Sequence, residues 1–242
     1  DLKLHKLCMF MPRWFANVRI APSTEAAEFM FGKGCVLKGK AQIVHNGIDL
    51  NIYRYNDENR RSVKAEFGIE DKYVVGHVGR FNQQKNHKKL IEIFEKLRHE
   101  NPNAILMLVG KGELEEDIRK LVQDRGLEDS VIFSGVRSDV PRLLCGMDVF
   151  VFPSLYEGMP NTVIEAQATG LPCVVSDTIT REARVTDLVR YVPLSADSTE
   201  WVKEFKFIAT NDRGQFNKML QENGYDIREC VVKLIGLSFE KV

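Results

Sequence analysis

The 242-residue sequence lacks the cysteine pattern and the charge surplus that mark several classes of protein. Its five cysteines include no C-x-x-C pair and stand far apart, at Cys8, Cys35, Cys145, Cys173 and Cys230. Scattered cysteines argue against a disulfide framework, and reduced thiols indicate a cytosolic protein. Lys plus Arg and Asp plus Glu both total 34, so the formal net charge is +0. Because proteins that bind nucleic acid usually carry a basic surplus, we expect no nucleic-acid partner.

Several catalytic, metal-binding and membrane signatures are absent as well. The sequence contains no D-x-D, no H-E-x-x-H and no G-x-S-x-G. Their absence argues against a metal-chelating acidic pair, a zinc metalloprotease and a serine hydrolase, and we expect no metal site. The sequence also has no signal peptide and no apolar run long enough to cross a bilayer.

From residue 73 onward, apolar runs alternate with segments of helical pattern. The runs occupy residues 74–78, 104–109, 131–133, 148–152 and 172–175, and the helical segments residues 87–99, 113–125, 139–145 and 161–169. Strands that are apolar throughout, separated by helices, are typical of a parallel sheet covered on both faces. The predicted fold class is therefore α/β, with a Rossmann-like parallel sheet whose ligands bind at the carboxyl ends of the strands.

The two ends of the chain follow a different pattern. Residues 1–46 hold strand-like pieces at 18–21 and 42–44 and a helix from Ser23 or Thr24 to Gly32, which is too little to bury a core of its own. We predict a linker over 47–72 with a short helix near 62–67, a ligand-binding domain over 73–210, and C-terminal helices over 211–242. The sequence starts at Asp1 inside a helical pattern, which indicates a fragment of a longer protein.

Two glutamates, Glu157 and Glu165, bracket the start of a predicted helix that follows an apolar strand. Pro160 suits the first helical position, where a missing N–H costs nothing. The N–H groups of a helix start beside two carboxylates suit a ligand that carries both phosphate and hydroxyls, such as a nucleotide-sugar. The plainer interpretation is one glutamate on a loop and one on an exposed helix face. Glu165 argues against it, because its apolar neighbours look buried and a carboxylate near a core needs a partner.

Two loops that follow strands carry further candidates. Arg80 and Lys85 lie on the loop over 79–86, where two cations can neutralise a diphosphate. For this loop taken alone, two ordinary surface cations are the better interpretation, because basic loop residues are common. Gly110 and Gly112 resemble the start of a dinucleotide fingerprint. Glu115 replaces its third glycine, which disfavours dehydrogenase chemistry and leaves a tight turn that can line a cleft.

Taken in order, these segments resemble a known family. The order runs Gly79-Arg80-Phe81…Lys85-Asn86, Leu108-Val109-Gly110-Lys111-Gly112, Phe133-Ser134-Gly135, Phe152-Pro153-Ser154-Leu155-Tyr156-Glu157-Gly158…Glu165 and Gly170-Leu171-Pro172-Cys173-Val174-Val175-Ser176. It is similar to the retaining glycosyltransferases of GT-B architecture, most of all to bacterial members that build cell-surface polysaccharides. The resemblance covers roughly residues 40–210.

The resemblance implies a fold, a reaction and a set of site residues. The chain would be the C-terminal, donor-binding half of a GT-B fold with only the tail of the acceptor domain, residues 1–46. Arg80 and Lys85 would grip the donor diphosphate, Glu157 the transferred sugar and Glu165 the ribose. Further donor contacts would come from Gly110, Gly112, Gly158, Met159, Asn161 and Thr162, and base contacts from Val136, Arg137 and Val140.

The same resemblance implies the partners. The donor would be a nucleotide-sugar, most commonly a UDP-sugar, used without a metal or other cofactor. The acceptor would be a sugar or a lipid-linked acceptor, and the protein would be cytoplasmic, with peripheral membrane contact through the N-terminal domain. Two alternatives stay open at this point. One is a nucleotide-sugar epimerase of the same fold, and the other is a fragment that binds a nucleotide-sugar without catalysis.

Overall fold

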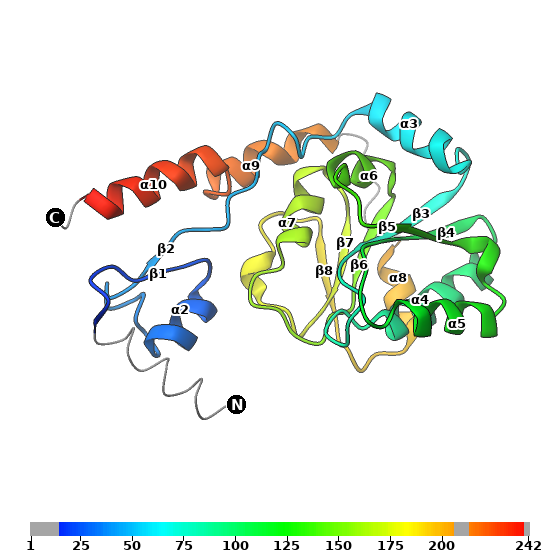
Figure 1. Cartoon of the computed structure of the whole chain (residues 1–242), viewed down its shortest axis with the longest axis horizontal. Coiled ribbons are helices and arrows are strands. Elements are labelled where there is room, and N and C mark those ends of the chain that lie inside the picture. The colour runs from blue at the N-terminus through cyan, green and yellow to red at the C-terminus, as the bar shows by residue number, and fades with distance from the viewer. Residues whose placement is uncertain (1–14, 206–212, 240–242) are drawn as a thin grey trace. The chain divides into compact units, whose positions relative to one another are not determined.

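The computed structural model describes residues 15–205 and 213–239, which fall into two compact units (Figure 1). Unit 1 comprises residues 1–49 and 220–242, and unit 2 residues 50–219. The helical pattern predicted at the start of the chain lies outside the described residues.

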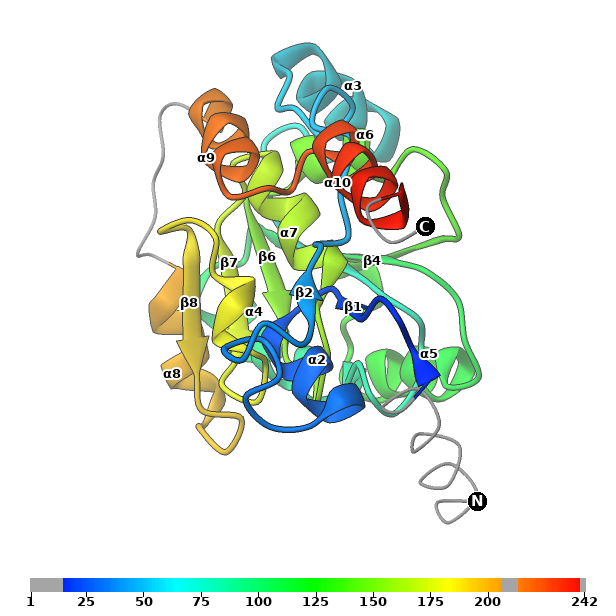
Figure 2. The same cartoon turned by 90° about the vertical axis from the view of Figure 1, so that its left-hand side faces the viewer.

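Unit 2 is built on a six-stranded sheet in which every pairing is parallel, as predicted. Its strands are β3 (Tyr73–Val78), β4 (Ala104–Val109), β5 (Val131–Gly135), β6 (Val149–Phe152), β7 (Cys173–Ser176) and β8 (Val189–Val192). They lie in the order β5-β4-β3-β6-β7-β8, and Figure 2 shows β6, β7 and β8 side by side. The order reverses between β3 and β6, so these two neighbours form the topological switch point of the sheet.

The outer strand β8 is absent from the sequence-based prediction. Its four residues are Val-Arg-Tyr-Val, and only the two valines are buried. A short edge strand pairs on one side only, so it does not need the unbroken apolar run that identified the inner strands.

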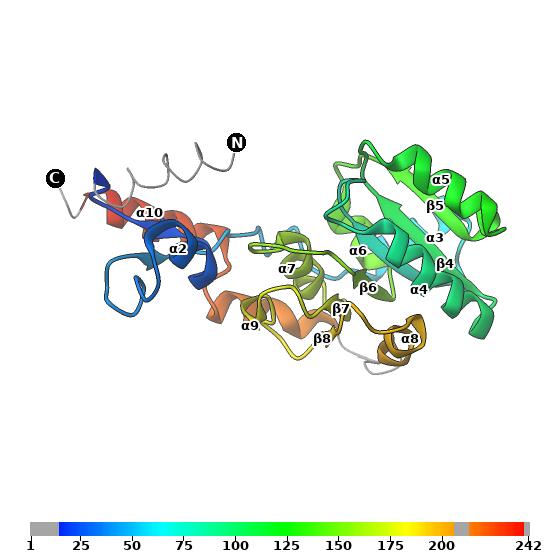
Figure 3. The ribbon, with the colours of Figure 1, turned by 90° about the horizontal axis from the view of Figure 1, so that it is seen from below.

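Helices cover both faces of this sheet (Figure 1). One face carries α3 (Asp57–Phe67), α6 (Val140–Gly146) and α7 (Asn161–Ala168), and the other α4 (His87–Glu100), α5 (Glu115–Asp124) and α8 (Ser198–Phe205). Figure 3 shows α4 and α5 beside each other on their common face. Successive strand residues such as Val74 and Val75 enter opposite core clusters, because side chains alternate across a strand. The described part of the unit also contains the 3-10 turns η1 (Glu128–Ser130), η2 (Arg181–Ala183) and η3 (Arg213–Gln215).

Helix α3 begins at Asp57, five residues before the predicted start of a helix near 62. Asn56 caps it, since its side chain accepts hydrogen bonds from the amides of Glu58 and Asn59. Its residue Val63 is fully buried in the core cluster of its face. Residues 57–61 are therefore helical where the polar sequence indicated a linker.

Arg213 ties together the carboxyl ends of two helices on that same face. Its guanidinium donates to the carbonyls of Thr169, beyond α7, and of Leu144, Cys145 and Met147, at the end of α6. Helices leave their last carbonyls without internal partners, and a buried arginine with several donors satisfies them. Burial lowers the pKa of Arg213 to about 10.

Unit 1 has a much smaller core. A parallel pair of two-residue strands, β1 (Ile20–Ala21) and β2 (Gln42–Ile43), flanks α2 (Thr24–Phe31). Its N-cap is Ser23, one of the two residues that the sequence offered. Helix α10 (Ile227–Phe239) is anchored by an amide of Ile227 that donates to the carbonyl of Ile48 at 3.0 Å. Helix α9 (Phe216–Glu222) contains the boundary between the two units. Among the described residues, no helix combines the length and the apolar character that a membrane span requires.

Candidate functional site

Two loops leave the sheet at its switch point, residues 79–86 after β3 and residues 153–160 after β6. Three hydrogen bonds to backbone carbonyls join them. The Gln84 side chain donates to the Tyr156 carbonyl at 2.9 Å, the Leu155 amide to the Gln84 carbonyl at 2.8 Å, and the Asn86 side chain to the Pro153 carbonyl at 3.1 Å. Ligands of open parallel sheets bind in the crevice at such a point, so these loops form the first candidate site.

The two loops are also joined by an ion pair between predicted site residues. Lys85 Nζ lies 2.6 Å from Glu157 Oε1, and the side chains are only 17% and 9% exposed. The same ammonium lies 4.6 Å from the centre of the Phe152 ring, where a cation is attracted to the aromatic face. A poorly solvated pair of this kind is costly to break unless a replacement partner arrives. An anionic ligand is such a partner for Lys85, and its binding would release the Glu157 carboxylate.

Arg80, the second predicted cation of the loop, has a different environment. Its side chain is 70% exposed and its Nη2 lies 3.1 Å from Glu113 Oε2, on the loop after β4. Among the described residues, the structure therefore gives Lys85 and Arg80 separate carboxylate partners. An exposed ion pair contributes little to stability, so Arg80 is available to a ligand at low cost.

Helix α7 starts at the end of the second loop. Pro160 occupies its N-cap position, and no side chain caps the helix. Gly158 and Asn161 are exposed, whereas Met159 packs against the core. The Thr162 hydroxyl is buried and has no hydrogen-bond partner among the described residues. The helix start combines a partial positive charge with unused hydrogen-bonding capacity, which suits an anion.

Glu165 lies one turn further along α7 and is partly buried. Burial raises the pKa of its carboxyl group, and a hydrogen bond with Tyr53 opposes this shift. The pKa of Tyr53 is itself raised by burial and by the nearby Glu165 charge. The structure thus supplies the partner that a half-buried carboxylate requires. Tyr53 was missed by the sequence analysis because it lies in the predicted linker and belongs to no motif.

Gly110 and Gly112, both predicted to line the ligand cleft, lie where two loops pack closely together. A Cβ atom on Gly110 would lie 2.1 Å from the Gly79 carbonyl oxygen, and one on Gly112 would lie 2.3 Å from that of Phe81. The Phe81 amide donates to the Lys111 carbonyl at 3.1 Å across this contact. The close approach of the loops after β3 and β4 by itself requires glycine at both positions.

The loop after β5 carries the residues predicted to contact the base. Val136 is 74% exposed, and Val140 is the first residue of α6. The Arg137 guanidinium donates to Asp139 at 2.8 Å and to Glu66 at 3.0 Å. The hydrogen bonds from Arg137 lower the pKa of Asp139. Arg137 is therefore held by two carboxylates, and Val136 presents the open surface of this loop.

His77 is fully buried, and its Nδ1 lies 2.9 Å from the Val151 carbonyl, so it is a residue of the core. In the part of the chain that the structure describes, no three His, Cys, Asp or Glu residues form a group that could hold a metal ion.

Comparison with known proteins gives consistent results. EpsF of Bacillus subtilis (strain 168), assigned as a glycosyltransferase, is 33% identical over 227 residues, which cover 92% of this chain and 59% of that protein. The UDP-Gal:alpha-D-GlcNAc-diphosphoundecaprenol alpha-1,3-galactosyltransferase of Escherichia coli is 37% identical over 143 residues, or 57% of this chain and 37% of that protein. The crystal structure of Anabaena HepE in complex with UDP and glucose matches with a TM-score of 0.80 at 19% identity, over 97% of this chain and 66% of that one.

The chain thus spans less than two thirds of the length of each of these proteins. The parallel sheet of unit 2, with helices on both faces, matches the C-terminal Rossmann-like domain of GT-B glycosyltransferases. The family model described as glycosyl transferases group 1 matches residues 59–226, which include both loops of the switch point. On this match, the chain belongs to the glycosyl transferases group 1 family.

Proposed function

We propose that this chain is the donor-binding half of a retaining glycosyltransferase. The enzyme transfers a sugar from a UDP-sugar to a sugar or lipid-linked acceptor in bacterial cell-surface polysaccharide synthesis, without a metal ion. The observation that carries the proposal is the Lys85–Glu157 pair, which places a cation and a carboxylate together at the switch point of the sheet. A cation for a diphosphate and a carboxylate for sugar hydroxyls are the two groups that a nucleotide-sugar needs.

The related proteins support the choice of substrates. The name of the Escherichia coli relative specifies UDP-Gal as donor and a diphosphoundecaprenol-linked sugar as acceptor, and HepE was crystallised with UDP and glucose. A lipid-linked acceptor would bring the reaction to the cytoplasmic face of a membrane, with peripheral contact through the acceptor domain.

The residues of the site have separate roles in this reaction. When the bond from the anomeric carbon to the diphosphate oxygen breaks, negative charge develops on the leaving diphosphate. Lys85, Arg80 and the start of α7 at Asn161 and Thr162 stabilise that charge. Glu157, once released from Lys85, accepts hydrogen bonds from the transferred sugar, and Glu165 accepts them from the ribose. Val136 lies against the base.

The test is calorimetric titration of the chain with UDP, combined with removal of the Lys85 charge. Lys85→Met alone would leave Glu157 poorly solvated and unpaired, which destabilises the fold. The double variant Lys85→Met/Glu157→Gln removes both charges at once and avoids that penalty. We expect it to unfold near the parent's temperature and to bind UDP roughly 10- to 100-fold more weakly, because a charge-assisted hydrogen bond contributes about 1.5–3 kcal/mol.

The matched control is Lys96→Met, which removes a cation from the far end of α4, where Lys96 pairs with Glu100. It should bind UDP like the parent. Unchanged UDP affinity in the double variant would refute the leaving-group role of Lys85. Binding of UDP without transfer from any UDP-sugar would identify the chain as a binding fragment, and release of an epimerised sugar without acceptor would identify an epimerase.

A further inference from the structure

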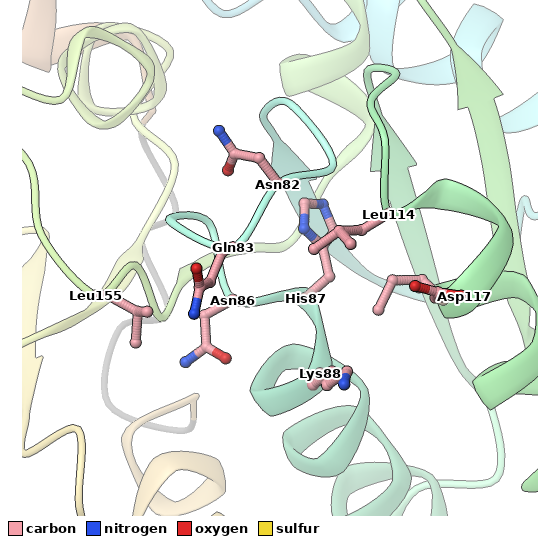
Figure 4. Close-up of a pocket in the computed structure, with 9 residues that line it drawn as sticks. Asn82, Gln83, Asn86, His87, Lys88, Leu114, Asp117 and Leu155 are labelled. Carbon is pink, nitrogen blue, oxygen red and sulfur yellow. The ribbon is translucent and has the colours of Figure 1, made fainter. Parts of the chain in front are cut away.

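A cavity of about 410 Å³ opens beside the Lys85–Glu157 pair's loops, at the same edge of the sheet (Figure 4). It lies between the first turns of α4 and α5, and Leu155 closes one side. Lys85 and Glu157 do not line it. The cavity nevertheless uses the same two loops as the Lys85–Glu157 pair, since it is lined by Asn82, Gln83 and Asn86 from one and by Leu155 from the other. Its volume is within the range of about 300–1,000 Å³ that is usual for small-molecule sites.

Several polar side chains of this cavity can form further hydrogen bonds. Gln83, Lys88 and Asp117 are exposed, and none of the three side chains makes a hydrogen bond or ion pair within the part of the chain that the structure describes. The Asn82 side chain uses its oxygen to accept from the Lys85 amide at 3.0 Å and keeps its amino group. The cavity therefore offers donors and acceptors together, with one positive and one negative charge.

Apolar side chains form the other part of the wall. Leu114 and Ile118 come from the start of α5. Leu155 lies opposite Leu114, on the other side of the cavity (Figure 4). Ile118 is almost completely buried and belongs to the core cluster, so this wall is continuous with the core. An apolar surface flanked by amides and charged groups suits a ring with a C–H face and a hydroxylated edge.

Other classes of ligand fit this lining less well. An inorganic anion would find Lys88 and the uncapped start of α4, but it would also face the Asp117 carboxylate. A purely apolar ligand would take Lys88 and Asp117 out of water without giving either a partner. A carbohydrate hydroxyl can donate to Asp117 and accept from Lys88 or Asn82, so both charges stay paired.

We propose that this cavity binds a sugar ring of the acceptor, so that the donor-binding half also contributes an acceptor subsite. The inference rests on the proposed function, because only transfer to a carbohydrate requires a second sugar beside the donor. A ring in the cavity would lie against the loops that carry Lys85 and Glu157, at the same carboxyl edge of the sheet.

The experiment is a two-dimensional ¹⁵N–¹H NMR titration of the whole chain with three methyl glycosides, those of α-glucose, α-galactose and N-acetyl-α-glucosamine. We expect at least one to shift the amides of residues 82–88 and 114–118 with millimolar affinity, in the presence and absence of saturating UDP. UDP itself should shift the amides of residues 157–165 in the same samples.

Two variants on α5 supply the test of the cavity and its control. Asp117→Asn should weaken glycoside binding roughly tenfold, because a hydrogen bond to a charged group is lost. Asp124→Asn makes the same change at the exposed far end of the helix and should bind like the parent. UDP affinity should be unchanged in both variants.

Three results would overturn the inference. The first is that no glycoside shifts these amides although UDP binds. The second is that UDP displaces the glycoside. The third is that inorganic phosphate produces the same shifts and the glycosides do not. Failure of UDP to bind would instead count against the proposed function. The two ideas therefore fail by different measurements on the same sample.

Discussion

At the residue scale, two buried imidazoles stand out because three of their four ring nitrogens lack the partners that burial usually demands. His77 and His87 lie edge to face with their ring centres 4.8 Å apart, beneath the loop that carries Lys85. Neither His77 Nε2 nor either His87 ring nitrogen has a hydrogen-bond partner among the described residues. Burial lowers the pKa of His77 to about 4 and that of His87 to about 2. Both imidazoles are therefore neutral near pH 7, which leaves Lys85 as the positive charge of this cluster.

These lowered pKa values make the stability of the fold depend on pH. In the unfolded chain a histidine has a pKa of about 6.5. Below that pH the unfolded chain binds protons that the folded protein excludes, so the free energy of unfolding falls as the pH falls from 6.5 toward 4. In this window the two histidines together lower the free energy of unfolding by up to about 2.7 kcal/mol for each pH unit of acidification. Their full contribution is present above pH 6.5.

His87→Phe is expected to halve that histidine contribution, to about 1.4 kcal/mol per pH unit, because one titrating group is removed. Phenylalanine can keep the stacking of His87 on Phe81, whose ring centre is 4.1 Å away. The measurement is urea unfolding between pH 6.5 and 4.5. Phe94→Leu, on the same helix, changes core packing without removing a titrating group and should keep the parent's slope. An unchanged slope in His87→Phe would mean that His87 is protonated in the folded protein.

At the element scale, the site depends on how closely the loops after β3 and β4 approach each other. The obstacle to a larger residue at Gly112 is the backbone of Phe81, which cannot rotate away as a side chain can. Gly158, by contrast, has no atom within 4 Å of a Cβ atom built on it. Two glycines near one site are thus required for different reasons, one by packing and one, under the proposed function, by contact with the donor.

Gly112→Ala is expected to reduce stability by about 1–3 kcal/mol, the usual cost of overpacking. UDP binding should weaken with it, because the loop that carries Lys85 must shift. Gly158→Ala should leave the unfolding temperature unchanged and weaken UDP binding alone. Thermal unfolding and UDP titration of both variants separate the two effects. The assignment of Gly158 to the donor site fails if its variant binds UDP as tightly as the parent.

At the scale of the whole molecule, the two units differ greatly in what holds them together. Unit 2 has two large core clusters, one on each face of its sheet, with side chains such as Trp201 and Phe150. The cluster of unit 1 around α2 is made of Ala21, Ala27, Cys35 and Ala41. Small side chains bury little apolar area, so the first unit should open at a lower free energy than the second.

Hydrogen exchange measures this difference and its response to a ligand. UDP at about 100 times its dissociation constant should add about 2.7 kcal/mol to unit 2, which slows its most protected amides roughly 100-fold. Amides of β3, β4, β6 and β7 should show this effect, whereas those of α2 and α10 should exchange at the parent rate. Equal slowing in both units would show that the donor site involves unit 1 as well, contrary to the proposal.

Local sequence patterns were sufficient to predict most strands and helices of unit 2. The apolar runs located five of the six parallel strands, and the period of the intervening segments located α4, α5, α6 and α7 to within two residues at either end. These patterns work because an inner strand is buried on both faces and a helix on one, so burial dictates the residue types in order along the chain. The edge strand β8 and the first turn of α3 were missed, because half-burial and capping by Asn56 leave no such run.

The pairing of the site residues was decided by the tertiary structure. The sequence by itself determined that Arg80, Lys85, Glu157 and Glu165 follow or flank strands. It could not show that Lys85 pairs with Glu157, that Arg80 pairs with Glu113, or that Tyr53 contacts Glu165. These partners lie 72, 33 and 112 residues apart in the chain, and only the strand order β4-β3-β6 brings the first two pairs together. The hydrophobic pattern of the sequence indicates whether each residue is buried, but not which distant residue it contacts. The arrangement of charges around a ligand depends on which strands become neighbours in the sheet.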